Sequence, residues 1–248
     1  MRNITQKASH ITPQFVFCLL PLLVLAACAA LPPSRGQPAS NSQNGQTAVV
    51  IDWVDFIKFG GITYVATSPG RPLVAGDLGP VFATIKFKLD GNVQNPNYQS
   101  KDGDAAFLNP GTKVYTVKGY KPTFRLTAYQ NGEIQLYEAD TNPHAKVGAD
   151  LLDIGGKVLY IGINSPQDGK TELGSIKNSK QVEDLVTMVL NAPVNQNYQS
   201  QESSQYFIDF HLRDGTSVIR AYWPDSGELS GGILLPPVFG AAIKQALH

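Results

Sequence analysis

The dipeptide Asn131-Gly132 is the feature that most constrains how this chain folds, because it lies between two runs of alternating apolar and polar residues. Both central positions of a type I′ turn need positive φ, and Asn-Gly adopts it readily. The runs FRLTAYQ and EIQLYEA therefore predict a two-residue hairpin in which Leu126 faces Tyr137. In the same register, Arg125 faces Glu138 as a cross-strand pair of opposite charge.

Other segments upstream of this hairpin also have the composition of strands. Runs such as ITYVATS and TKVYTVKGY are rich in β-branched and aromatic residues and are separated by Gly, Pro and Asn. This pattern is typical of strands joined by turns. We therefore predict a mainly β module over residues 47–145.

Residues 146–248 predict an α+β module. KVLYIGI is a strand-like run, and Asn178 is a suitable N-cap for a helix whose apolar residues recur at i, i+3, i+4 and i+7. That stripe consists of Val182, Leu185, Val186 and Val189. A last helix is expected from Pro237, a residue that suits the first turn.

Together these segments predict an α+β fold that is mainly antiparallel β. An all-β module is followed by an α+β module with two helices packed on a sheet. The chain shows no repeated strand–helix–strand rhythm. A doubly wound nucleotide-binding fold therefore does not fit the pattern.

A second hairpin is expected around Asp214-Gly215. A two-residue turn there places Asp209 opposite Arg220, again as a pair of opposite charge. The apolar face of this hairpin would contain Tyr206, Ile208, Phe210 and Leu212 opposite Trp223, Ala221, Ile219 and Ser217. The other face would be half exposed to water.

The first thirty residues have the features of an export signal. Two basic residues precede the apolar stretch FVFCLLPLLVLAACAA, which is short for a membrane span and is interrupted by Pro21. The stretch ends in Leu25-Ala26-Ala27-Cys28, which resembles the lipobox of bacterial lipoproteins. The resemblance implies lipidation of Cys28 and cleavage between Ala27 and Cys28, so that 1–27 is a lipoprotein signal peptide. The alternative is an uncleaved amino-terminal membrane anchor.

The segment 28–46 is expected to be a disordered tether, because it is rich in Pro, Ser, Gln and Asn and lacks apolar periodicity. The two cysteines are Cys18 and Cys28, so the expected body has no thiol for catalysis or metal binding. Twenty basic residues balance twenty acidic ones, and no basic run occurs. A nucleic-acid partner is therefore not expected.

No catalytic or metal-binding motif is recognisable, and we expect no cofactor and no metal. Asp209 and His211 with a serine would make a triad only if Asp209 were free of its predicted partner Arg220. Carboxylate pairs of the glycosidase type depend on separation in space, which the sequence does not reveal. The candidate binding surface consists of polar and aromatic residues: Tyr98, Tyr198, Tyr222, Asp209, His211 and Arg220.

Tyr98 and Tyr198 belong to two short segments of nearly identical sequence. The segments 95–100 and 195–200 read NPNYQS and NQNYQS. One interpretation is a duplicated module with two equivalent contact loops. The other is coincidence in a chain rich in Asn and Gln, since the flanking segments do not align.

The sequence therefore predicts a lipid-anchored protein on the extracytoplasmic side of the cell membrane or outer membrane. Its expected function is a non-catalytic binding or sensing module of the cell envelope. The expected partners are the membrane, through the anchor, and an envelope protein or polymer. Two alternatives are an envelope hydrolase with a carboxylate-based site and a purely structural envelope lipoprotein.

Overall fold

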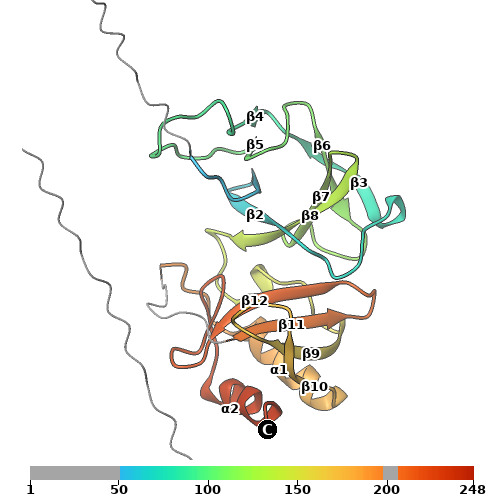
Figure 1. Ribbon diagram of the computed structural model, residues 1–248, viewed down its shortest axis with the longest axis vertical. Helices are drawn as coiled ribbons and strands as arrows, with labels where there is room; N and C mark the ends of the chain where they lie inside the picture. The colour runs from blue at the N-terminus through green and yellow to red at the C-terminus, as the bar shows by residue number, and fades with distance from the viewer. Residues whose placement is uncertain (1–50, 198–205) are drawn as a thin grey trace, which may run out of the picture. The chain divides into compact units, whose positions relative to one another are not determined.

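The computed structural model describes residues 51–197 and 206–248, which form an α+β fold with two mainly antiparallel sheets (Figure 1). The predicted signal peptide, its cleavage site, Cys28 and the tether lie outside the described residues. The described residues belong to one compact unit.

The first sheet has the order β3-β6-β7-β8-β2-β1-β5-β4, and only the β4–β5 pair is parallel. A 3₁₀ turn, Ala75–Asp77, precedes β3. The strands of this sheet are β1 (Phe56–Phe59), β2 (Ile62–Thr67), β3 (Leu78–Thr84), β4 (Phe87–Lys88), β5 (Asp104–Ala105), β6 (Lys113–Val117), β7 (Arg125–Gln130) and β8 (Glu133–Thr141).

The second sheet has the order β10-β9-β11-β12-β13-β14 and is antiparallel throughout. A 3₁₀ turn, Gly148–Asp150, leads into it. Its elements are β9 (Val158–Asn164), β10 (Glu172–Ile176), β11 (Tyr206–Leu212), β12 (Ser217–Trp223), β13 (Glu228–Leu229) and β14 (Ile233–Leu234), with helices α1 (Ser179–Asn191) and α2 (Pro237–Ala246).

The β7–β8 hairpin has the predicted register. Arg125 pairs with Glu138 and Leu126 with Tyr137. Asn131 and Gly132 adopt φ of 52° and 86°, as the turn requires. This prediction is confirmed because every determinant of the register lies within a few residues of the turn.

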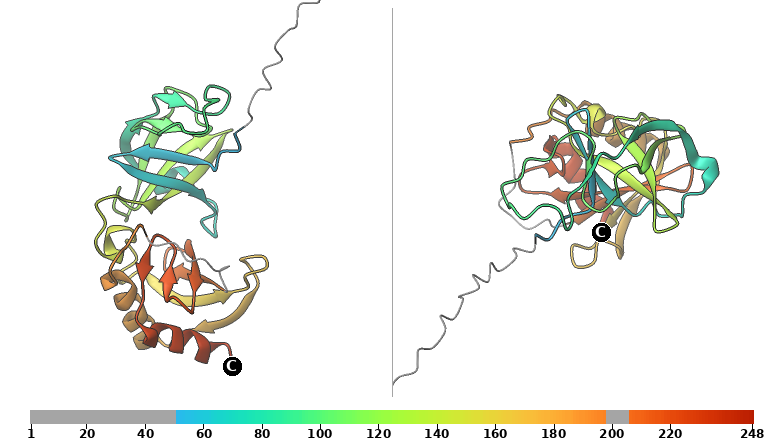
Figure 2. Two further views of the ribbon diagram at one scale, coloured as in Figure 1. Left: turned by 90° about the vertical axis from the view of Figure 1, so that its left-hand side faces the viewer. Right: turned by 90° about the horizontal axis from the view of Figure 1, so that it is seen from above.

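Both helices also form as predicted. The side chain of Asn178 caps α1 by accepting from the backbone N–H of Gln181 at 3.0 Å. The predicted stripe of α1, Val182, Leu185, Val186 and Val189, is buried. Helix α2 begins at Pro237 and buries Phe239 and Ile243. Both helices contribute to one apolar core with Ile161, Phe210 and other residues of the second sheet, and Figure 2 shows them beside that sheet.

The predicted register of the β11–β12 hairpin is wrong by one residue. Asp209 lies opposite Ile219, and Arg220 lies opposite Ile208. The loop has three residues rather than two, because Leu212 and Thr216 are still bonded and Gly215 takes a positive φ of 82°. A shift of one residue moves a side chain to the other face of a strand pair. The expected ion pair between Asp209 and Arg220 therefore does not form.

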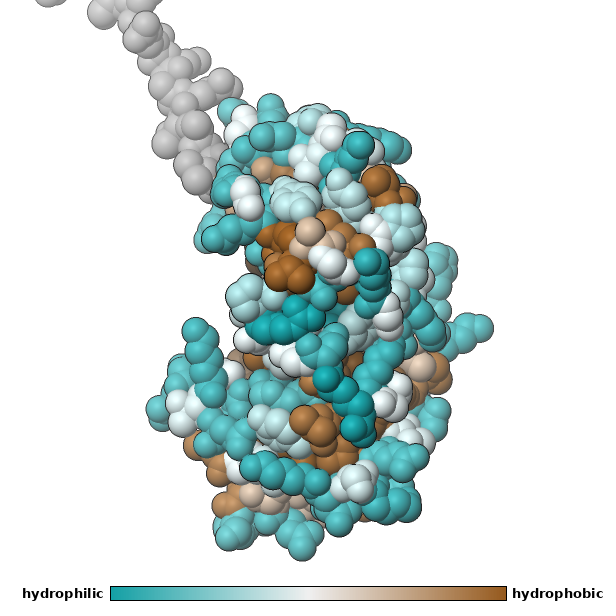
Figure 3. Space-filling view, turned by 90° about the vertical axis from the view of Figure 1, so that its right-hand side faces the viewer, coloured by the Kyte–Doolittle hydropathy of each residue, from teal (hydrophilic) through white to brown (hydrophobic). Residues whose placement is uncertain are grey.

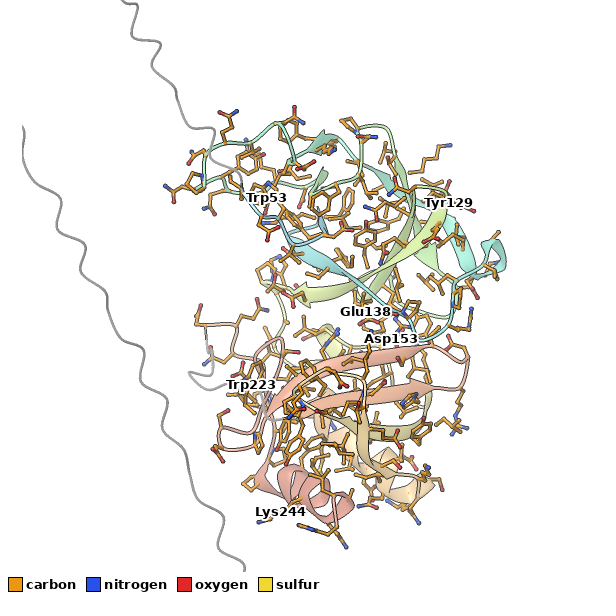
Figure 4. All side chains as sticks on the ribbon, in the orientation of Figure 1. Trp53, Tyr129, Glu138, Asp153, Trp223 and Lys244 are labelled. Carbon is orange, nitrogen blue, oxygen red and sulfur yellow. The ribbon has the colours of Figure 1, made fainter. Side chains whose placement is uncertain are left out.

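Arg220 instead joins a buried ion network between the two sheets. The guanidinium of Arg125 donates to Oε1 of Glu138 at 2.7 and 2.9 Å, and Arg220 donates to Oε2 of the same carboxylate at 3.0 Å. Arg125 also donates to the Thr216 hydroxyl and to the Ser217 carbonyl oxygen. Figure 4 labels Glu138, which is 2 % exposed.

We expect Glu138→Ala to lower the free energy of unfolding by about 3–5 kcal/mol, because two guanidinium groups lose their buried counter-ion. Urea denaturation would measure this loss. Asp90→Ala, which removes the surface partner of Lys88, is the control and should change stability far less. Equal effects of the two substitutions would contradict the role of the network.

Candidate functional site

The candidate site lies on the face of the second sheet that points away from the helices. Polar side chains of β9, β10 and β11 converge there over Gly162, whose lack of a side chain leaves room for them. A Cβ atom at Gly162 would lie 3.0 Å from Oε2 of Glu172 and 3.2 Å from Nε2 of His211. We call Asn164, Glu172, Asp209 and His211 the Gly162 cluster.

Asp209 is the buried member of the cluster. Its Oδ2 lies 3.3 Å from Nε2 of His211, and its side chain is 8 % exposed. Its other oxygen, Oδ1, is buried and has no hydrogen-bond partner among the described residues. Leaving a buried carboxylate oxygen without a donor is costly, which distinguishes Asp209 from the other members of the cluster.

The surroundings of Asp209 favour its protonated form. Burial raises the pKa of this carboxyl, and the nearby charge of Glu172 acts in the same direction. His211, Ser217 and Asn164 oppose that rise. The raised pKa of Asp209 therefore reflects a buried environment that acidic residues on the protein surface do not have.

An aromatic ring borders the cluster. Tyr160 stacks on His211 with 4.0 Å between ring centroids and 9° between planes. The Nζ of Lys177 lies 5.6 Å from the centroid of the same tyrosine. These contacts hold His211 in place beside Asp209.

Among the described residues of the predicted binding surface, the structure brings together Asp209 and His211. Arg220 contacts Glu138 in the buried ion network, and Tyr222 is a core residue that is 1 % exposed. Tyr98 lies in the loop before β5, where its hydroxyl donates to Asp104 at 2.9 Å. Tyr198 lies outside the described residues.

Sequence reasoning missed Asn164 and Glu172. They reach Asp209 only because β9 pairs with both β10 and β11, and neither pairing is signalled by a short turn. The one available signal was Gly162 within the strand-like run KVLYIGI, since a glycine inside a strand marks a close approach.

The first residues of the two similar segments, 95–97 and 195–197, form the same local turn. Oδ1 of Asn95 accepts from the N–H of Asn97 at 2.9 Å, and Oδ1 of Asn195 accepts from the N–H of Asn197 at 3.2 Å. Both are Asx turns, which Asn favours by mimicking a backbone turn. The repeated sequence thus corresponds to repeated turn chemistry in its first residues.

The members of the Gly162 cluster offer several hydrogen-bonding groups. Within 51–197 and 206–248, no three His, Cys, Asp or Glu side chains are grouped so as to hold a metal ion. Ser217 lies opposite His211 on β12, but no hydrogen bond joins their side chains in this part of the chain. Carboxylate and amide oxygens around Gly162 offer acceptors for a ligand.

Comparisons with protein families, characterised proteins and solved structures found no match to this chain. No helix in the described ranges is long and apolar enough to cross a bilayer. On the face shown in Figure 3, hydrophobic residues form separate patches within a mainly hydrophilic surface.

We expect Asp209→Asn to change how stability depends on pH. The pKa of Asp209 is raised in the folded protein, so its protonated form contributes to the free energy of unfolding. This contribution is complete below the pKa of Asp209 in the unfolded chain, and it is lost as the pH rises through the folded pKa. The variant should gain stability relative to the wild type between acid and neutral pH. Urea denaturation across this range measures the gain, with Asp184→Asn on the exposed side of α1 as the control. Parallel curves for Asp209→Asn and wild type would contradict the raised pKa.

Proposed function

We propose that this protein is a lipid-anchored extracytoplasmic module that binds a component of the cell envelope without chemically changing it. The anchor is inferred from Leu25-Ala26-Ala27-Cys28 at the end of an apolar leader. The absence of cysteine from 29–248 leaves Cys28 as the one thiol of the expected mature chain. Two or three acyl chains at that residue would anchor the body stably.

The observation that favours binding is the unpartnered Oδ1 of Asp209. A buried acceptor beside His211 and close to Asn164 and Glu172 matches a ligand rich in hydroxyl or amide donors. Envelope polymers of sugars and peptides carry both kinds of donor. We therefore propose such a polymer as the ligand of the Gly162 cluster.

The anchor can be tested with two cysteine variants. Cys28→Ser should move the protein out of the processed, membrane-bound pool, because the thiol that accepts the lipid is lost. Cys18→Ser lies within the same apolar leader and should leave processing unchanged. Cell fractionation and mass spectrometry of the amino terminus measure both outcomes. Normal cleavage and membrane retention of Cys28→Ser would refute the anchor.

The binding site can be tested by co-sedimentation with purified cell-wall polymer. Asp209→Leu removes the acceptor at similar volume and should weaken binding about tenfold, the loss expected for one hydrogen bond to a charged group. Asp90→Leu, at a half-exposed position of the first module, should bind like the wild type. Equal binding by all three proteins would remove the Gly162 cluster from the proposal.

A second candidate is an envelope hydrolase. The cluster contains the buried carboxyl of Asp209, whose pKa is raised by burial and by the negative charge of the nearby Glu172. Two carboxyl groups held in different environments are the usual arrangement for acid–base catalysis. Release of soluble fragments from the same polymer would favour this function, provided that Glu172→Gln and Asp209→Asn both abolish it. Intact polymer after prolonged incubation would favour binding.

A further inference from the structure

A cavity lies between α2 and the loop that joins β12 to β13. Its volume is about 600 Å³, within the range of small-molecule sites. Apolar side chains of the loop and the helix form its walls, among them Leu235, Ile243 and Leu247. This α2 cavity belongs to the helix-covered side of the second sheet, so it is separate from the Gly162 cluster.

The lining of the α2 cavity includes Tyr222, whose hydroxyl group lies at its floor. Tyr222 lines the cavity and is 1 % exposed, yet its hydroxyl makes no hydrogen bond within the described part of the chain. The hydroxyl lies against α2 at Gly240, where a Cβ atom would come within 2.8 Å of it. Because it borders the cavity and has no protein partner there, this hydroxyl is available to donate to a bound molecule.

The cavity also has one acidic and one basic side chain. Asp225 comes from the β12–β13 loop. Lys244, which is labelled in Figure 4, comes from α2. Neither side chain has a hydrogen-bond or ion-pair partner in residues 51–197 and 206–248. The α2 cavity thus combines an apolar interior with one free charge of each sign.

We propose that the α2 cavity binds a short zwitterionic peptide with apolar side chains. Its ammonium group would pair with Asp225 and its carboxylate with Lys244. The apolar side chains would contact Leu235 and Ile243, and the peptide carbonyl would accept from the Tyr222 hydroxyl. A molecule with one charge alone would make only one of these two charge-assisted contacts, so the free dipeptide should bind more tightly than either blocked form.

Titration calorimetry with chemically blocked peptides tests the two charges separately. The probes are Leu-Val, its N-acetyl derivative and its C-terminal amide, added to the purified full chain in lipid nanodiscs with empty nanodiscs as the blank. Each block should weaken binding to the wild type about tenfold, because it removes one charge-assisted contact. Acetylation should make no difference to Asp225→Asn, and amidation should make none to Lys244→Gln.

Two further variants separate recognition from folding. Tyr222→Phe keeps the packed ring and should weaken Leu-Val binding several-fold through loss of the hydroxyl alone. Lys113→Gln removes an exposed charge from β6 and should bind like the wild type. The proposal is overturned if Leu-Val does not bind saturably, or if free and blocked peptides bind the wild type equally. These outcomes are independent of the polymer-binding tests on Asp209.

Discussion

The buried guanidinium of Arg125 joins the two sheets, because it bonds groups of both. Its planar group donates to Glu138 on β8 and to Thr216 and the Ser217 carbonyl of the second hairpin. The central carbon of the guanidinium lies 4.5 Å from the ring centroid of Tyr120 and 5.0 Å from that of Phe124. Arginine suits this position because it remains charged and presents several donors in a fixed plane.

The register of the second hairpin decides which side chains lie beside Asp209. Because β11 and β12 are joined by a three-residue loop, Arg220 lies opposite Ile208 and contacts Glu138 rather than Asp209. Asp209 then has His211 as its nearest ionisable neighbour and keeps one oxygen unpartnered. The pairing that directs Arg220 into the ion network thus leaves the buried carboxyl of Asp209 with one unpartnered oxygen, and perturbed acids of this kind are common at functional sites.

The second sheet presents different chemistry on its two faces. The face covered by α1 and α2 is apolar, and the α2 cavity lies at its edge, where the Tyr222 hydroxyl meets Gly240. The opposite face has polar residues over Gly162. Each face has a glycine that lets another group approach closely, because a Cβ atom at Gly162 would meet Glu172 and His211 and one at Gly240 would meet the Tyr222 hydroxyl.

The sequence by itself determined the elements whose causes are local. The Asn131-Gly132 hairpin, the cap at Asn178 and the start of α2 at Pro237 all follow from residues close to one another in the chain. Only the tertiary structure decided the sites, because Asn164, Glu172 and Asp209 come from strands whose pairing no short turn specifies. The β11–β12 hairpin lies between these cases. Its turn residues were recognisable, but one additional loop residue exchanged the partners of Asp209 and Arg220, since side chains alternate between faces at every step along a strand.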